Sequence, residues 1–262
     1  MGQISKGRAY CSILAVIGFL AAGCSVLDAG PEHSVRAEWR RSYDLQTGGD
    51  VSVRNVNGRI RVEPATGRSL EIVAEKVGRG SSEDRAKDAL DRIEIQEDVT
   101  PSSVHVETKF HRTGGSRDNW EVAYTVRLPS GAKADFSTVN GGLVVSGVSG
   151  AMRVHTTNGG ITARDITGSI DATTTNGGID VDLIALRDAV TAECTNGGIT
   201  LRIPADAKAT LSAATVNGGI RTTGLKLQVR DWNRRRLEAD VNGGGTPIRL
   251  RGVNGGVTVS DR

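Results

Sequence analysis

The sequence predicts an all-β, single-domain parallel β-solenoid with one short helix and an irregular C-terminal cap. Three observations predict this fold: an Asn-Gly-Gly motif that recurs at nearly constant spacing, alternation of apolar and polar residues around each motif, and an aromatic content of only 3%. Recurrence at a fixed period of about 20 residues is typical of repeat proteins. Alternation with a period of two is typical of strands with one buried face, and stacked narrow sheets seldom have room for aromatic rings.

The central repeat aligns on asparagines that follow one another after 18, 18, 20 and 21 residues. We interpret each unit as a strand, a turn, a shorter strand and a second turn. We expect each Gly to supply a positive φ at the corner, and the Asn side chains to form a hydrogen-bonded ladder between rungs. The aligned residues are the asparagines Asn140, Asn158, Asn176, Asn196 and Asn217, the glycines Gly141, Gly159, Gly177, Gly197 and Gly218, and the apolar Leu143, Ile161, Ile179, Ile199 and Ile220.

Two architectures are compatible with this pattern, because Asn-Gly is also the strongest signal for a short antiparallel hairpin. In a solenoid, equivalent outward residues stack about 4.8 Å apart, so alternating charges attract one another. A meander gives no reason for equivalent positions to pair. Two outward columns do alternate in charge, and they favour the solenoid: Asp135, Arg153 and Asp171 in one, and Arg164, Asp182 and Arg202 in the other.

The first 23 residues have the features of a bacterial lipoprotein signal. Lys6 and Arg8 precede an apolar run, and small residues then lead to Cys24. The run is shorter than the roughly 20 residues that a stable membrane-spanning helix needs, and it suits a secretory signal. An ordinary cleaved signal is the alternative. We predict that Cys24 is acylated and anchors the protein to a membrane, and that residues 24–37 form a tether.

Charge and cysteine content narrow the classes of function. Without residues 1–23 the chain has 31 basic and 30 acidic residues, so its charge balance gives no reason to expect a nucleic-acid partner. If Cys24 is acylated, Cys194 is the one remaining thiol, and no internal disulfide can form. Cys194 occupies a column in which the other central rungs have Thr, which indicates a small buried residue.

Residues 38–130 are predicted to form an N-terminal β part with the helix. Residues 50–67 follow the register of the repeat around Asn57, with Val51, Val53, Ile60 and Val62 inward. Within "SSEDRAKDALDRIEI", Ser81 or Ser82 can cap a helix whose buried face carries Ala86, Leu90 and Ile93. Strands are expected again at "SVHVETKF" and "NWEVAYTVRLPSG", with an exposed loop over 112–119 between them.

We expect the repeat rungs over residues 131–224. We expect residues 225–262 to form the C-terminal cap. Beyond Asn217 the register slips, and the last Asn-Gly step, from Asn242 to Asn254, is only 12 residues. Repeat stacks need atypical ends, since an open last rung invites association. We expect Trp232 to cover the interior there. The basic run Arg234–Arg236 is alternatively a contact patch for lipid headgroups or an acidic polymer.

The motifs resemble a bacterial β-strand-repeat family of proposed adhesins whose function is unknown. The segments that carry the resemblance are "DVSVRNVNGRIRV", "VRLPSGAKADFSTVNGGLVVSGVSG" and the Asn-Gly-Gly-Ile series, so it covers residues 40–260. The resemblance implies a β-solenoid of the cell envelope and supplies no catalytic residues.

Motifs that would indicate catalysis or a cofactor are missing from the sequence. The histidines have no zinc-like spacing with a cysteine or with each other, and there is no Gly-x-Ser-x-Gly nucleophile turn. We therefore predict no metal and no cofactor. A single calcium ion near Asp180 and Asp182 is a minor alternative, because the other rungs do not repeat Asp180. The histidines are His33, His105, His111 and His155.

These features favour a non-catalytic lipoprotein of the cell envelope, on the outer membrane in a Gram-negative cell, that presents its faces for adhesion. Its expected partner is another envelope protein, a polysaccharide or the same protein. The rival hypothesis is a β-helix enzyme that binds or degrades a polysaccharide, which needs outward carboxylates without compensating cations. Asp182 is the best candidate, but we expect Arg164 and Arg202 to flank it. A sensory role in the envelope is a third hypothesis, supported by location alone.

Overall fold

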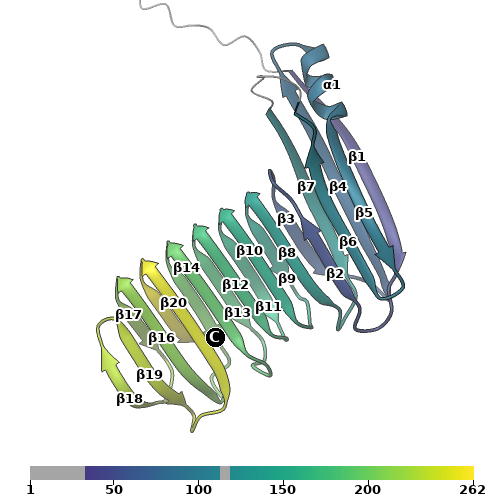
Figure 1. Cartoon of the computed structure of the whole chain (residues 1–262). Helices are drawn as coiled ribbons and strands as arrows, with labels where there is room; N and C mark the ends of the chain where they lie inside the picture. The colour runs from purple at the N-terminus through teal and green to yellow at the C-terminus, as the bar shows by residue number, and fades with distance from the viewer. Residues whose placement is uncertain (1–32, 113–118) are drawn as a thin grey trace, which may run out of the picture. The chain divides into compact units, whose positions relative to one another are not determined.

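A computed structural model describes residues 33–112 and 119–262. The predicted signal, Cys24 and most of the predicted tether lie outside the described residues, as does most of the loop at 112–119. The described chain forms two mixed β-sheets and one helix, α1 (Glu83–Asp91) (Figure 1). Among the described residues, no helix has the length and apolar character needed to cross a membrane.

Each sheet contains one strand from every rung, together with additional strands at its ends. Sheet A has ten strands, in the order β1 (His33–Asp44), β4 (Ser69–Gly80), β7 (Asn119–Leu128), β3 (Ile60–Pro64), β9 (Leu143–Ser146), β11 (Ile161–Ile166), β13 (Ile179–Leu183), β15 (Ile199–Ile203), β21 (Val257–Asp261) and β17 (Ile220–Thr223). Sheet B has eleven strands, in the order β18 (Leu227–Asn233), β19 (Arg236–Val241), β16 (Ala209–Asn217), β20 (Thr246–Asn254), β14 (Val190–Asn196), β12 (Ile170–Asn176), β10 (Met152–Asn158), β8 (Lys133–Asn140), β2 (Asp50–Arg54), β6 (Ser103–Phe110) and β5 (Ile93–Thr100).

The central rungs lie parallel to one another, with equivalent residues side by side. Ile161 pairs with Leu143 on one side and with Ile179 on the other, and Ile179 pairs with Ile199. The first rung, β2 and β3, joins the same stack through β8 and β9. The predicted alignment of these rungs is therefore confirmed, and an antiparallel meander does not describe them.

The predicted order of the last rungs is wrong. Strand β20 lies between β14 and β16, and β21 lies between β15 and β17, so the last segment of the chain occupies the penultimate rung. Ile220 consequently neighbours Val257, and not Ile199 as expected. The inserted segment repeats the motif around Asn254, with Ile248 and Leu250 buried at the inward positions. It can pair on both sides because each rung offers the same parallel edge to the next.

Only part of residues 225–262 is therefore a cap. Asn242 belongs to the turn before β20, where its φ is 50° and its side-chain amide donates to the carbonyls of Ala205 and Ala207 at 2.9 and 2.8 Å. The cap consists of β19 and β18, which extend sheet B beyond β16. Trp232 lies on the last strand of the cap, β18, opposite the buried Leu237, and it remains 53% exposed.

The expectation of a wholly parallel stack fails at both ends. β1, β4 and β7 pair antiparallel in sheet A, β5 pairs antiparallel with β6, and β16, β19 and β18 pair antiparallel in sheet B. The connections explain two of these pairs. A parallel neighbour requires a crossover of about a dozen residues, whereas the two-residue turns between β5 and β6 and between β18 and β19 join only antiparallel strands.

The interior between the sheets is filled mainly by Val, Ile, Leu and Ala, as the alternation predicted. Tyr124 and Phe136 are the largest fully buried side chains. The Thr column is also buried, and its hydroxyls donate to glycine carbonyls of the neighbouring rung, as from Thr156 to Gly141 at 2.8 Å and from Thr174 to Gly159 at 2.9 Å. Cys194 takes the same place, 3% exposed, with its thiol 3.1 Å from the Gly177 carbonyl oxygen.

The predicted asparagine ladder runs through every rung. Each side-chain amide donates to the amide oxygen of the preceding rung, at 2.8 or 2.9 Å. All the donors point in the same direction along the stack. The ladder confirms that the inserted rung is in register, because it passes from Asn196 to Asn254 and then to Asn217.

The first glycine of each motif is required for a different reason from the one expected. Gly177 and Gly197 have φ of 149°, but Gly141 and Gly159 do not adopt left-handed backbone, so positive φ is no common requirement. The feature that these first glycines share is a close approach to the backbone of the neighbouring rung. A Cβ on Gly177 would lie 2.1 Å from the carbonyl oxygen of Gly159, and equivalent contacts recur along the stack. The second glycine has more room, since a Cβ on Gly178 would be 3.5 Å from its nearest neighbour.

Helix α1 agrees closely with the prediction. Ser82 is the N-cap, and its hydroxyl accepts a hydrogen bond from the Arg85 amide at 3.3 Å. Ala86 and Leu90 are buried as expected, together with Ala89. Ile93, also expected on the helix, is buried but begins strand β5, because the helix ends at Asp91. The helix packs closely on β4, where a Cβ on Gly78 would meet the Ala86 carbonyl oxygen at 2.3 Å.

We expect Gly177→Ala to destabilise the protein by about 3 kcal/mol or more, because its new methyl group would force the rungs apart. The matched control Gly178→Ala should change the free energy of unfolding by less than about 1 kcal/mol. Urea unfolding followed by circular dichroism measures both. Equal losses in the two variants would contradict the close-contact explanation.

A second prediction concerns Tyr124, which is buried and hydrogen-bonded to Thr108 at 2.7 Å. Burial raises the pKa of Tyr124 to about 12. Because this pKa lies above the ordinary value, the stability that Tyr124 contributes is complete below about pH 10 and is lost as pH rises through about 12. Urea unfolding between these values should show a loss of about 2–3 kcal/mol from this group. In Tyr124→Phe, the free energy of unfolding should depend correspondingly less on pH. If it fell with pH as steeply as in the unchanged chain, the assignment to Tyr124 would be contradicted.

Candidate binding groove

A groove with a volume of about 800 Å³ lies on the outer face of sheet B. Its floor crosses β2, β8, β10, β12 and β14, and β5 and β6 supply one side. Small outward residues leave the space open at the beginnings of the central strands, among them Ala151, Ser169 and Ala189. Gln96, Glu97 and Asp98 of the edge strand β5 line the side.

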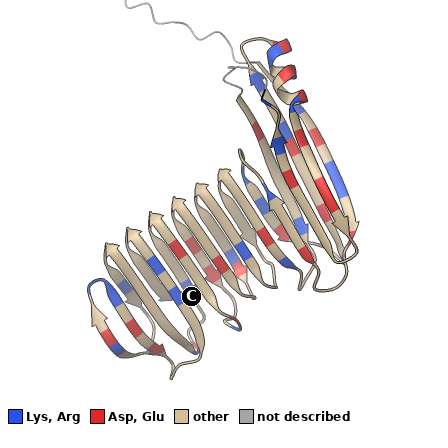
Figure 2. Cartoon of the chain, in the orientation of Figure 1, with Lys and Arg blue, Asp and Glu red and all other residues tan. Residues whose placement is uncertain are grey.

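A charged ladder crosses the groove in the column that the sequence predicted. Arg153 lies between Asp135 and Asp171, with guanidinium-to-carboxylate distances of 3.9 and 3.5 Å. Figure 2 shows basic and acidic residues side by side on these central strands. The three side chains are 43–67% exposed, so each pair contributes at most about 1 kcal/mol to stability. The ladder therefore leaves its charges accessible to a ligand.

The groove has an excess of negative charge. Carboxylates on the outer face outnumber permanently cationic side chains by five to three, and His105 adds one imidazole. Asp50 and Asp98 have no ion-pair partner among the described residues. Glu97 is not counted, because it lies opposite the buried Val106 and its carboxylate contacts Arg41 and Tyr43 of β1. The charged residues are Asp50, Asp98, Glu107, Asp135 and Asp171 against Arg54, Lys133 and Arg153.

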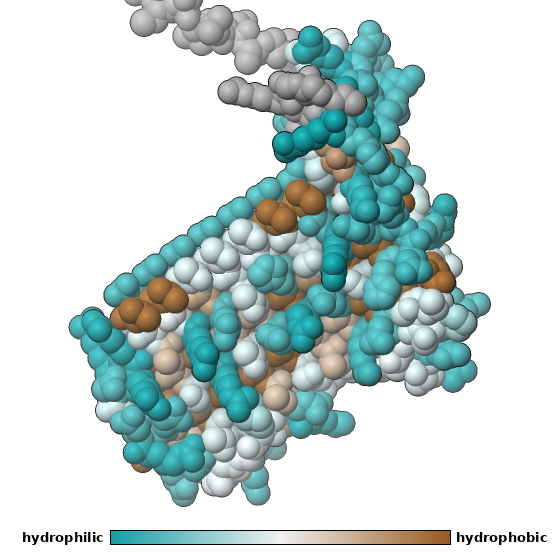
Figure 3. All heavy atoms as spheres, in the orientation of Figure 1, coloured by the Kyte–Doolittle hydropathy of each residue, from teal (hydrophilic) through white to brown (hydrophobic). Residues whose placement is uncertain are grey.

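Exposed apolar side chains border the same face near the asparagine ladder. The outward residues directly before ladder asparagines include Val56, Val139, Val216 and Val253, which are 38–54% exposed. Figure 3 shows this face as mainly hydrophilic, with hydrophobic residues gathered in small groups. The face thus combines polar, charged and limited apolar surface.

The second predicted charge column differs from the expectation. Arg164 and Arg202 both form their ion pairs with Asp180, each at 2.7 Å, and not with Asp182. Arg202 does flank Asp182 in the register of β13 and β15, as expected, but its guanidinium contacts Asp180. Arg164 has no position opposite Asp182, because the register of β11 against β13 shifts near Asp165, whose φ is 56°. Asp182 instead lies 3.2 Å from Arg262 in an ion pair that lacks hydrogen-bond geometry. Two cations thus already compensate Asp180, the residue considered for calcium.

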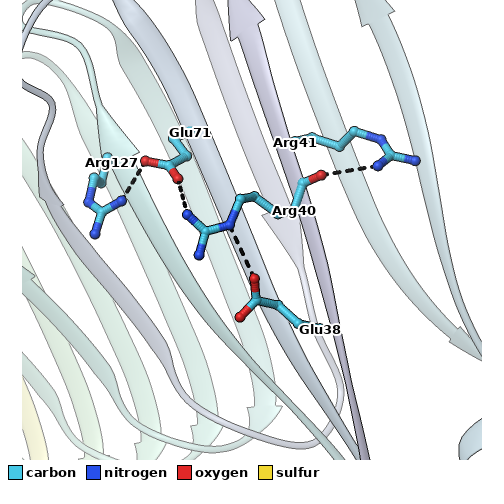
Figure 4. A network of polar contacts seen from close by, with 5 residues as sticks. All are labelled: Glu38, Arg40, Arg41, Glu71 and Arg127. Carbon is cyan, nitrogen blue, oxygen red and sulfur yellow. Dashed lines mark hydrogen bonds and ion pairs between the residues drawn. The ribbon is translucent and has the colours of Figure 1, made fainter.

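A further ion-pair network lies on the outer face of sheet A (Figure 4). Glu71 of β4 accepts hydrogen bonds from Arg127 of β7 and, at 2.8 Å, from Arg40 of β1, which also contacts Glu38. The hydrogen bond from Arg127 is the main cause that lowers the pKa of Glu71. This network joins the edge strand β1 to β4 and to β7 beyond it, which is a structural role.

The remaining candidate residues are not brought together. The four histidines are spread over β1, β6 with the residue after it, and β10, and no group of metal-ligating residues occurs among the described positions. Burial raises the pKa of the Cys194 thiol, which makes this residue a poor nucleophile. The motif asparagines and glycines belong to the ladder and to the close rung contacts, and not to the groove.

Sequence reasoning missed the groove. One signal could have indicated its floor, since the position seven residues before the motif asparagine is small in three successive rungs, at Ala151, Ser169 and Ala189. No local pattern indicates that β5 comes to lie beside that floor.

The fold can now be compared with known proteins. A family model described as Toastrack DUF4097 matches residues 46–260. The chain belongs to the Toastrack DUF4097 family. A search of curated proteins found no match.

Solved structures also resemble this Toastrack chain. A "putative cell adhesion protein" from Clostridium sporogenes aligns with a TM-score of 0.50 and 10% sequence identity, over 87% of this chain and 100% of the other. A "putative adhesin" from Bacteroides fragilis aligns with a TM-score of 0.33 and 13% identity, over 86% of this chain and 97% of the other. At such low identity, the first similarity supports the fold alone.

Proposed function

We propose that this Toastrack protein is a non-catalytic, lipid-anchored protein of the cell envelope that uses the groove on sheet B to bind an envelope partner. The observation that carries the proposal is the groove itself, which is open, crosses several rungs and has more carboxylates than cations along it. Similarity to proteins named as adhesins is consistent with this role. Acylated Cys24 would hold the protein at the membrane, the outer membrane in a Gram-negative cell.

The charge of the groove selects among partners. Like-charge contacts disfavour an anionic polymer, while carboxylates accept hydrogen bonds from hydroxyl and ammonium groups. A polysaccharide that is neutral or carries amino groups therefore fits the groove better than an acidic polysaccharide or a nucleic acid. A basic segment of an envelope protein is the second partner with suitable chemistry.

Charge compensation in the two charge columns supports a non-catalytic role. An enzyme that cleaves glycosidic bonds needs a pair of carboxyl groups with different protonation states. Asp135 and Asp171 share Arg153, and Asp180 is held between two arginines, so these carboxylates are engaged in ion pairs. The enzyme hypothesis is left with Asp50 and Asp98, the groove carboxylates that have no ion-pair partner among the described residues.

The anchor can be tested with labelled palmitate in growing cells. We expect the unchanged chain to carry the label and to remain in the membrane fraction, and Cys24→Ser to lose both properties. Cys194→Ser is the matched control and should keep the label. Labelled Cys24→Ser protein would contradict the proposed anchor.

The groove can be tested by titration calorimetry with neutral, amine-bearing and acidic polysaccharides. We expect binding of the neutral or amine-bearing polymers, and at least a tenfold loss of affinity in Asp98→Lys, which corresponds to about 1.4 kcal/mol. Glu63→Lys, on the outer face of sheet A, is the matched control and should bind normally.

Three results would count against this proposal. Preference for the acidic polymer, or equal affinity in Asp98→Lys, would show that the groove is not the binding site. Release of new reducing ends or unsaturated products during incubation would favour the enzyme hypothesis instead.

A further inference from the structure

The two ends of sheet B are unpaired edges, and they differ in charge. One edge is β18 and the other is β5, and each pairs with a single neighbour. Edge strands expose backbone donors and acceptors that can pair with another chain. We propose that β18 of one copy pairs with β5 of a second copy, so that the protein assembles head to tail.

Charge complementarity supports this pairing. Residues 224–236, which contain β18 and the following turn, include five basic residues and one acidic residue. Strand β5 contains three acidic residues and no basic one. Among the described residues, Lys226, Arg234 and Arg235 form no ion pair, and neither does Asp98 of β5. Repulsion between like charges opposes β18–β18 and β5–β5 pairing, so the contact selects unlike edges.

Both edges also carry exposed apolar side chains. Val99 of β5 is 48% exposed, and Val229 and Trp232 of β18 are 55% and 53% exposed. The residues of β19 opposite Val229 and Trp232 are Ala239 and Leu237, which are buried, so both exposed residues lie on the inner face of sheet B. They remain uncovered because sheet B continues for two strands beyond its last rung, whereas sheet A ends at β17.

Strand directions are compatible with the proposed contact. β18 runs in the same direction as β16, since both pair antiparallel with β19. β5 runs opposite to the rung strands, since it pairs antiparallel with β6, which is parallel to β2. Two copies in the same orientation therefore meet as antiparallel strands, the slightly more stable arrangement per residue.

The unequal ends of the two sheets fit together in this arrangement. At the β5 end, sheet A extends one strand further than sheet B, through β1. When β18 meets β5 of the next copy, β1 of that copy comes to lie opposite β18. The inner face of β1 carries the partly buried aromatic residues Trp39 and Tyr43, which can cover Val229 and Trp232. The A sheets of the two copies do not join, because a gap one strand wide remains between β17 of one copy and β1 of the next.

A contact between two different surfaces leaves one free edge at each end of a dimer, so it produces open chains instead of closed dimers. Sedimentation velocity of the purified full chain, with the same detergent in every sample, measures the mass of the assemblies. We expect a mean mass that grows past the dimer with protein concentration and that falls when salt screens the charges.

Edge variants distinguish the proposed contact from other modes of association. Lysine on an edge strand opposes pairing, so we expect Val99→Lys and Val229→Lys each to be monomeric alone. Their equimolar mixture should form dimers and nothing larger, because one intact β5 and one intact β18 remain. Val216→Lys is the matched control. This valine is 54% exposed on β16, which lies between β19 and β20 and is not an edge strand, so its variant should assemble like the unchanged chain.

The mixture also shows that both variants are folded, since each must supply one intact edge. Asp98→Arg provides a second β5 variant and should be monomeric alone. The proposal is overturned if the unchanged chain stays monomeric at every concentration, if either lysine variant still self-associates, or if the mixture forms no dimer.

Discussion

The structure depends on how closely one rung can lie on the next. At each corner the first glycine of the motif approaches the backbone carbonyl of the neighbouring rung so closely that no side chain fits between them. This contact lets the asparagine amides reach one another at 2.8 or 2.9 Å and lets the Thr hydroxyls bond the glycine carbonyls. The corner, the ladder and the buried Thr column are therefore one interlocked unit.

Equivalence between rungs explains the order in which they stack. Because every rung presents the same backbone edge, a later segment can take a place between two earlier ones. The chain uses this freedom once: it forms the rung of Asn217, turns back through β18 and β19, and then fills the place beside Asn196 with the rung of Asn254. The outer face of sheet B forms the groove where β5 and β6 border the rungs.

The sequence predicted what depends on local pattern and missed what depends on distant pairing. The pairing of Ile161 with Ile179, the cap at Ser82 and the burial of Cys194 follow from periodicity or from local hydrogen bonding, and all are confirmed. The place of Asn254 was missed because the motif defines a rung without defining its neighbours. The ion pair of Asp182 with Arg262 was missed because Arg262 follows β21, the inserted strand whose place the motif does not define.

Neighbouring positions in the inserted rung provide the most direct test. Position 253 lies beside 195 and 216, since the flanking residues pair in register, whereas 195 and 216 lie two rungs apart. Adjacent strands are about 4.8 Å apart, within the Cα separation that a disulfide permits, and two rungs exceed it. Mild oxidation of double-cysteine variants should therefore crosslink Thr195→Cys with Val253→Cys, but not with Val216→Cys. Crosslinking of 195 with 216 and not with 253 would contradict the inserted rung and the stacking that it represents.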